Sequence, residues 1–285
     1  MLETAFDSSD WDDLLALRNY ESRIIRYADE LIRQLSTFSG KPVNICQWLS
    51  YFTFDVMGDL AFGKSFDMLR TGKAHFAVKL LKSAMPPVAW MGAAPWIIPV
   101  LLNTVGAGPI SDFIKWSEKQ VEERKKMKPA EPDIMSYIIG SPSAKFKTAA
   151  EEHNWLVGDS RLIVVAGSDT THTTLAFACY HLAKDPSQVE KLRAELETAE
   201  YEKDPANLSI LQNLDYLNGV INESLRLYPP LPGGVFRLSP PEGLLIGDHF
   251  IPGDINILTP HWVIQRCKWC QFAPDSCRIP LSNAC

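Results

Sequence analysis

The amino-acid sequence predicts a mainly α-helical fold with a small β-rich section near the C-terminus. Two observations carry this prediction. Before Pro229, long segments repeat apolar side chains every three or four positions, which is the spacing of one helix face. After Pro229, the chain is rich in Gly and Pro and has short alternating apolar runs, the pattern of β-hairpins.

The first helices are bounded by stop signals. Apolar positions recur at helical spacing over Arg18–Phe38, and Gly40-Lys41-Pro42 ends that segment. The next apolar segment predicts a helix that Asn44 caps and that ends near Gly63. The same periodicity predicts further helices over 111–128, 133–140, 155–184 and 187–199, and a pair of helices over 208–229.

Composition and charge limit the classes of function. The chain has 285 residues, of which 46% are hydrophobic and 22% charged, values that are ordinary for a globular protein with a sizeable core. Its formal net charge is -6, whereas a nucleic-acid-binding surface needs a basic patch. We therefore expect no nucleic acid as a partner.

The range Ser83–Ser111 contains no charged residue and is long enough to suggest a membrane span. Five prolines interrupt it, and so many prolines break a continuous helix. Two interpretations remain open. The range is either an apolar loop that touches a membrane surface or ordinary core and turns.

The helix predicted over 155–184 carries polar residues where packing would favour leucine. Gly167 removes side-chain bulk and lets another group approach the backbone, and the Thr170 hydroxyl can bond to the carbonyl of Ala166. Asp169 supplies a carboxylate that could shuttle protons from solvent. Such a groove suits a small ligand that needs protons in a dry site. The alternative is a buried helix with a packing glycine and a capped threonine.

Three charged residues lie further along the chain. Glu223 and Arg226 are three residues apart on one helix face, so a salt bridge is available. Their helix is otherwise apolar and the pair could be buried, although spacing alone also fits an ordinary helical ion pair. Arg237 lies near a turn, where an arginine is either solvated or reaches a carboxylate of a bound cofactor.

Taken in order, these segments resemble the cytochrome P-450 family. "AGSDTT" (166–171) resembles the oxygen-activating segment of that family's long central helix, and "ESLR" (223–226) resembles its E-x-x-R helix. The Gly- and Pro-rich section resembles the β-rich section that follows, and "FDVMGDLAFGKSF" (54–66) resembles fungal members. The resemblance covers roughly Leu17–Arg266.

The resemblance implies a haem-dependent, iron-containing monooxygenase that oxidises an apolar small molecule, in fungal secondary metabolism, with electrons from an NADPH-dependent reductase. Asp169 and Thr170 match the catalytic acid–alcohol pair that delivers protons during oxygen activation. Ala166 and Gly167 match cofactor-binding positions that line the oxygen groove over the haem.

The same resemblance implies roles for the other segments. Arg237 matches a residue that binds a haem propionate, and Glu223 and Arg226 match a structural pair that holds the haem-side core together. Ser83–Ser111 falls where the family has a hydrophobic loop near the substrate entrance, often at the membrane. This implies a location at the surface of the endoplasmic reticulum. No anchor precedes Met1, so we expect the chain as written to be cytoplasmic.

The family's iron ligand is a cysteine thiolate in a segment resembling F-x-x-G-x-R-x-C-x-G, and this sequence contains no such segment. No glycine follows Gly253, so we do not expect the tight loop that presents the thiolate. We therefore predict a partial P-450 domain over residues 1–266, truncated at both ends, that does not bind haem normally and is inactive as written. We predict that residues 267–285 form an unrelated, disordered Cys-rich tail.

Two alternatives remain for the chain as a whole. Cys267 and Cys270 have C-x-x-C spacing, with Cys277, Cys285 and His261 nearby, which permits a zinc site in the tail. Otherwise the chain is a degenerate helical fragment without enzymatic activity, whose uncovered apolar surface favours association.

Overall fold

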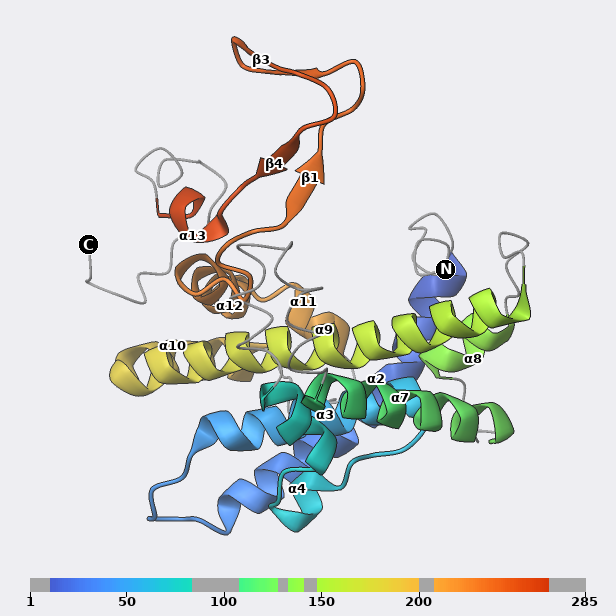
Figure 1. The fold of residues 1–285 in the computed structure, drawn as a ribbon. Coiled ribbons are helices and arrows are strands. Elements are labelled where there is room, and N and C mark those ends of the chain that lie inside the picture. Colours follow the sequence, from blue (N-terminus) through green and yellow to red (C-terminus); the bar gives the residue numbers. More distant parts are fainter. Residues whose placement is uncertain (1–10, 84–107, 128–132, 141–147, 200–207, 267–285) are drawn as a thin grey trace. The chain divides into compact units, whose positions relative to one another are not determined.

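The computed structural model describes residues 11–83, 108–127, 133–140, 148–199 and 208–266 (Figure 1). Helices make up most of these ranges, as the sequence predicts. The chain divides into two compact units, Met1–His172 and Thr173–Cys285. Most of the predicted apolar loop and the whole predicted tail lie outside the described residues.

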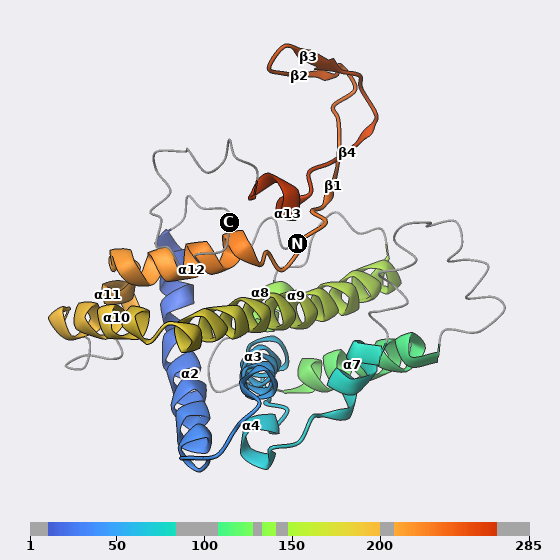
Figure 2. The ribbon, with the colours of Figure 1, turned by 90° about the vertical axis from the view of Figure 1, so that its left-hand side faces the viewer.

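The described part of unit 1 consists of helices and the loops that connect them, without strands. Its core is formed around α3 (Ile45–Phe62), which contacts α2, α4, α7 and α8; Figure 2 shows α3 nearly end-on, with α2 and α7 on either side. Residues 76–83 are also helical. The other helices of the unit are α2 (Trp11–Ser36), α4 (Met68–Thr71), α7 (Gly108–Lys126), α8 (Ile134–Gly140) and the part of α9 (Ala149–Lys184) up to His172.

The ends of α3 are those that the sequence predicts. Asn44 is the N-cap, and its side-chain oxygen accepts a hydrogen bond from the backbone N–H of Gln47 at 3.2 Å. Gly63 follows the last turn with a φ of 67°, a left-handed conformation that glycine adopts without strain. Its N–H donates to the carbonyl of Asp59 at 2.9 Å. Local signals therefore determine where the central helix of unit 1 begins and ends.

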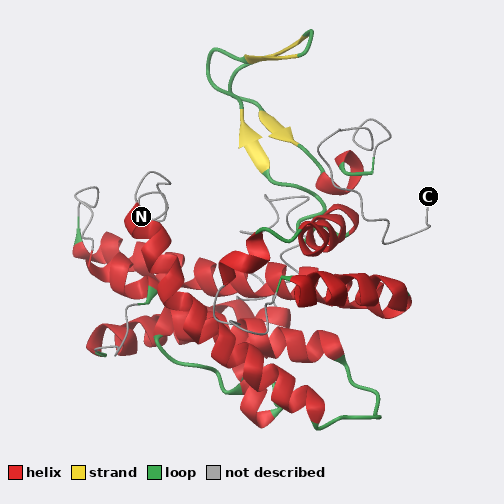
Figure 3. Cartoon of the chain, turned by 180° about the vertical axis from the view of Figure 1, so that it is seen from behind, coloured by secondary structure: helices red, strands yellow, loops and turns green. Residues whose placement is uncertain are grey.

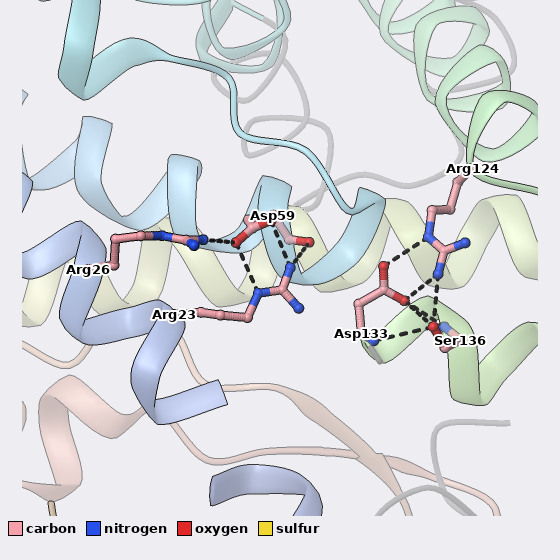
Figure 4. A network of polar contacts seen from close by, with 6 residues as sticks. All are labelled: Arg23, Arg26, Asp59, Arg124, Asp133 and Ser136. Carbon is pink, nitrogen blue, oxygen red and sulfur yellow. Dashed lines mark hydrogen bonds and ion pairs between the residues drawn. The ribbon is translucent and has the colours of Figure 1, made fainter. Parts of the chain in front are cut away.

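A buried ion pair joins α2 to α3. The guanidinium of Arg23 donates to the Asp59 carboxylate, with the closest contact, from Nη2 to Oδ1, at 2.7 Å, and also to the Asp59 backbone carbonyl at 2.9 Å (Figure 4). Arg26 adds a second contact to the carboxylate at 3.2 Å. A charge that is desolvated and paired in this way holds the two helices in one register.

A second buried ion pair joins α7 to the start of α8. Arg124 contacts both carboxylate oxygens of Asp133, at 2.6 and 2.8 Å, and its side chain also donates to the hydroxyl of Ser136 (Figure 4). The side chains of Arg124 and Asp133 are 4% and 0% exposed, respectively. Asp133 also accepts from the backbone N–H of Ser136, so it caps the first turn of α8.

Unit 2 combines short helices with two small antiparallel sheets, shown in yellow in Figure 3. Phe236 of β1 lies opposite Leu258 of β4, and Leu244 of β2 lies opposite Ile251 of β3. The predicted hairpin character after Pro229 is thus confirmed. The elements are the part of α9 from Thr173 onward, α10 (Pro186–Thr198), α11 (Leu208–Gln212), α12 (Asp215–Leu227), β1 (Phe236–Leu238), β2 (Leu244–Ile246), β3 (His249–Ile251), β4 (Asn256–Leu258) and α13 (His261–Ile264).

Several observed helices differ from the predicted ones. α2 begins at Trp11 rather than Arg18, and α9 begins at Ala149 rather than Trp155. The earlier start of α9 has a local cause, because the hydroxyl of Thr148 accepts from the N–H of Glu151 at 3.1 Å. The short α4 was not predicted. Its first amides donate to the carboxylate of Asp55, more than ten residues earlier, and a cap from so distant a residue leaves no signal in the local sequence.

Candidate functional site

The polar segment 166–171 lies within α9, which continues through it as an α-helix. The hydroxyl of Thr170 donates to the carbonyl of Ala166 at 2.6 Å, as predicted. This bond competes with the helix's own hydrogen bonding at the same carbonyl, and it fixes the rotamer of the threonine. The Thr170 oxygen is thereby held in one position on the surface of α9.

Asp169 stands next to that hydroxyl, and its side chain is 57% exposed. The Nδ1 atom of His172 lies 3.5 Å from the Asp169 carboxylate and 3.0 Å from the Asp169 carbonyl oxygen. The hydrogen bond with His172 lowers the pKa of the Asp169 carboxyl, and the charges of His172 and Lys82 act in the same direction against the effect of burial. Asp169 is therefore an ionised, solvent-accessible carboxylate at neutral pH.

Gly167 and Ser168 lie on a different face of α9, against α3. A Cβ atom at Gly167 would lie 2.7 Å from Cε and 2.8 Å from Sδ of Met57. The buried hydroxyl of Ser168 contacts the carbonyl of Thr53 at 3.4 Å. The predicted close approach at Gly167 therefore occurs, and the approaching group is the Met57 side chain. Ala166 and Asp169 are exposed instead.

We predict that Gly167→Ala leaves the free energy of unfolding within about 1 kcal/mol of the original value. The new methyl group would displace the flexible end of Met57, and alanine in place of glycine favours the helix by a similar amount. Chemical denaturation of the full chain measures this difference.

The matched control is Gly58→Ala, a second glycine inside a helix of unit 1. There a Cβ would lie 2.8 Å from the ring of Phe66 and 3.1 Å from the backbone oxygen of Lys64, neither of which can move as easily. We expect a loss of about 1–3 kcal/mol, as for an overpacked core. Equal losses in the two variants would contradict the interpretation of the Gly167 contact.

In unit 2, Glu223 and Arg226 form the predicted salt bridge. Arg226 Nε and Nη2 lie 2.6 and 2.7 Å from the two Glu223 carboxylate oxygens, which is a bidentate geometry. The Glu223 side chain is only 11% exposed. Arg226 also donates to the carbonyl of Gln265 at 3.1 Å. The pair therefore ties α12 to the chain just after α13, which is more than an ordinary surface ion pair would do.

Arg237 lies on β1 with an exposed side chain. Its guanidinium donates to the carbonyl of the preceding residue, Phe236, at 3.2 Å. No ion pair joins it to a carboxylate within the part of the chain that the structure describes. The predicted contact with a cofactor carboxylate is therefore sterically open and remains a prediction.

The predicted site residues thus form two groups. Ala166, Asp169 and Thr170 lie on one helix of unit 1, and Glu223, Arg226 and Arg237 lie in unit 2. Sequence reasoning missed Met57 and His172 as neighbours of the first group. The position of His172, three residues after Asp169 on the same helix, was the signal that could have found it.

The described ranges contain no cluster of three or more His, Cys, Asp or Glu side chains placed to hold a metal ion. The four cysteines of the predicted zinc site lie outside these ranges. No helix in the described part of the chain is both long and apolar enough to cross a bilayer.

Comparison with known proteins gives consistent matches. The sequence model of the family cytochrome P-450 matches residues 5–271. Cytochrome P-450 monooxygenase FCK2 of Fusarium pseudograminearum is 38% identical over 268 residues, which cover 93% of this chain and 49% of that protein. Tryprostatin B 6-hydroxylase of Aspergillus fumigatus is 36% identical over 264 residues, which cover 91% of this chain and 47% of the relative. The chain spans about half the length of these curated relatives.

A solved structure shows the same fold. The crystal structure of the cytochrome P-450DA haem domain matches with a TM-score of 0.70 at 17% sequence identity. The match covers 88% of this chain and 54% of the other. At this level of identity the likeness concerns the fold.

Proposed function

This chain belongs to the cytochrome P-450 family. We propose that it contributes to a haem-dependent monooxygenase reaction of fungal secondary metabolism, in which an apolar small molecule is oxidised. Two fungal relatives, one named as a monooxygenase and the other as a hydroxylase, support this proposal. Members of the family bind haem and receive electrons from a redox partner. We propose an NADPH-dependent reductase as that partner here.

Haem, when bound, supplies the activation of dioxygen. Inserting one oxygen atom into a C–H bond and releasing the other as water consumes two electrons and two protons. The electrons come from NADPH through the reductase, and the protons must come from solvent through the protein. The contribution that we assign to this chain is the path of those protons.

The observation that carries the proposal is the exposed Asp169 carboxylate beside a threonine hydroxyl of fixed orientation. Asp169 is ionised and accessible, so it takes up protons from water, and its neighbour His172 keeps the carboxylate in place. Thr170 donates its own proton to the carbonyl of Ala166, so its oxygen is oriented to accept a hydrogen bond from the proton that arrives.

The resemblance gives each of the remaining predicted residues a proposed role of its own. Ala166 presents a small side chain on the exposed face, where it lines the space for oxygen. Gly167 supports the same face indirectly, because its contact with Met57 sets how closely α9 lies on α3. Arg237 supplies an exposed cation for a haem propionate, and Glu223 and Arg226 hold the core of unit 2.

The described residues fit only part of a haem site. The helix face of Asp169 and Thr170 suits the oxygen side. Cys46 and Cys179 lie inside α3 and α9, respectively, and a cysteine within a regular helix is not presented by the tight loop that a thiolate ligand requires. The proposed activity therefore depends on an iron ligand beyond these two cysteines.

Two measurements, one spectroscopic and one kinetic, test this function. The native transcript is sequenced across the codon for Arg266, and its product is purified with haem and an NADPH-dependent reductase. If the transcript encodes the cysteine loop, we expect a thiolate-type Soret shift on reduction under carbon monoxide. The present sequence, expressed as written, is expected to lack that shift. A thiolate-type shift from the chain as written would contradict this prediction.

In the haem-loaded protein, we predict that Asp169→Asn lowers NADPH-dependent turnover by about 10²-fold or more, the usual contribution of a proton-transferring group. Glu152→Gln, in the first turn of the same helix, is the matched control and should leave turnover unchanged. Unchanged turnover in Asp169→Asn would disprove the assigned proton path.

We propose further that residues 1–266 form one partial P-450 domain. The family match over residues 5–271 supports the assignment of this body of the chain and runs five residues past the proposed boundary. Residues 267–285 would then form a tail of their own. We propose a location at the surface of the endoplasmic reticulum, with Ser83–Ser111 as the apolar contact. The absence of charge from that range supports this location.

A further inference from the structure

The ring of His172 lies against Asp169 in a way that fixes which ring nitrogen carries a proton. Both residues belong to α9 and to unit 1. The Nδ1 atom of His172 lies 3.0 Å from the Asp169 carbonyl oxygen and 3.5 Å from an oxygen of the Asp169 carboxylate. A carbonyl oxygen only accepts hydrogen bonds, so Nδ1 carries the proton of the neutral ring. The nitrogen that can bind a further proton is therefore Nε2.

The Nε2 atom of His172 is open to solvent. It makes no hydrogen bond to any residue that the structure describes, and it is not a buried atom. The side chain as a whole is 19% exposed. One ring nitrogen thus reaches water while the other lies against Asp169. This is the arrangement in which an imidazole can take up a proton on one side and release one on the other.

The Asp169 carboxylate needs such a donor because it is a weak base. Its hydrogen bond with His172 is the main cause that lowers the pKa of the carboxyl, and the charge of Lys82, from the helical residues 76–83, acts in the same direction. Hydronium is scarce at neutral pH, so water alone reloads a weakly basic carboxylate slowly. A donor whose charge changes near neutral pH is better matched to this task, and imidazole has that property.

We propose that His172 reloads Asp169 with protons during turnover, an inference that rests on the proposed monooxygenase function. Nε2 gains a proton from water, and the bond between Nδ1 and its hydrogen breaks as the Asp169 carboxylate gains that proton. The neutral ring then holds its proton on Nε2. It returns to its starting form when Nε2 releases that proton to water and Nδ1 gains another. Because it acts through Asp169, His172 is a positioning residue of the proton path and not a catalytic residue.

The position of the ring proton can be measured on the full chain as written, without haem. Nitrogen-15 NMR should find the neutral ring of His172 protonated on Nδ1. Carbon-13 NMR should show the Asp169 carboxylate signal moving as His172 gains its second proton between about pH 8 and about pH 5. This movement should be absent from His172→Asn. A neutral ring protonated on Nε2 would overturn the inference, whatever the turnover is.

Two variants separate proton transfer from simple positioning. Asparagine places an amide N–H close to the position of Nδ1, so His172→Asn can hold the Asp169 carboxylate but cannot pass a proton. His172→Phe keeps a ring and removes both abilities. In the haem-loaded product of the native transcript, we expect each variant to lose about 10-fold in turnover. This loss is smaller than that expected for Asp169→Asn, because water still reloads the carboxylate slowly. Circular dichroism establishes that each variant is folded.

The matched control is His153→Asn. His153 lies on the same helix, but its ring contacts Lys125 and Glu122 instead of Asp169, so the control should leave turnover unchanged. Turnover of the control should fall as the pH rises from about 6 to about 8, because His172 loses its second proton over this range. His172→Asn should lose this dependence on pH.

The outcomes distinguish this inference from the proposed function. Full turnover in His172→Asn, together with a large loss in Asp169→Asn, would overturn the transfer through His172 and leave the proposed proton path in place. Unchanged turnover in Asp169→Asn would disprove the proton path itself, and the inference with it.

Discussion

Asp133→Ala is expected to lower the free energy of unfolding by about 3–5 kcal/mol, because it leaves the buried charge of Arg124 without its partner. The variant also removes the cap of α8, since the Ser136 N–H loses its acceptor. Urea denaturation of the full chain, followed by circular dichroism, measures the loss. It should exceed that of any surface ion pair in unit 1.

Two controls separate the buried charge from the loss of a contact. Arg70→Ala removes a pair whose side chains are largely exposed, and should lower the stability far less than Asp133→Ala does. The double variant Arg124→Met/Asp133→Asn keeps a capping side chain but buries no charge, and should recover most of the stability. If the double variant were as unstable as Asp133→Ala, the buried charge would not be the cause.

Gly234→Ala is expected to destabilise the β1–β4 pair of unit 2 by about 2–5 kcal/mol, because left-handed alanine costs about 1–2 kcal/mol and displaced packing about 1–3 more. Gly234 has a φ of 73°, and a Cβ there would lie 2.0 Å from the backbone oxygen of Thr259. A backbone atom cannot yield as a side-chain end does, so the two chain segments must separate. Hydrogen exchange of the β1 and β4 amides reports this change.

The neighbouring glycine provides the control. Nothing lies within 4 Å of a Cβ at Gly233, and its φ is not in the left-handed region. Gly233→Ala should therefore leave the protection of β1 and β4 unchanged. Equal loss of protection in both variants would show that the cause is the stiffness of the loop and not the contact with Thr259.

Features that depend on neighbours in sequence were predicted correctly. The cap at Asn44 and the stop at Gly63 need only residues within one helical turn. The bond from Thr170 to Ala166 and the pair of Glu223 with Arg226 join positions four and three residues apart. Such contacts follow from helix geometry alone, whatever the rest of the fold does.

Features that depend on distant segments were not predicted. Periodicity shows which face of a helix is apolar but does not identify the segment that covers it. The contact of Met57 with Gly167 and the pairing of Arg23 with Asp59 therefore could not be read from the sequence. A pocket in unit 1 is lined by residues from three separate segments, within 64–67, 75–76 and 116–123, so the sequence alone could not identify its lining.

The packing contact between α3 and α9 has a consequence for how the chain folds during its synthesis. The Ser168–Thr53 contact joins residues 115 positions apart, whereas α2, α3 and α4 contact one another within one continuous stretch of chain. At ordinary rates of synthesis, α9 emerges on the order of ten seconds after α3. During that interval, α9 does not yet cover the surface of α3 around Met57. The nascent chain can therefore form incorrect contacts at this surface, which the folded protein excludes.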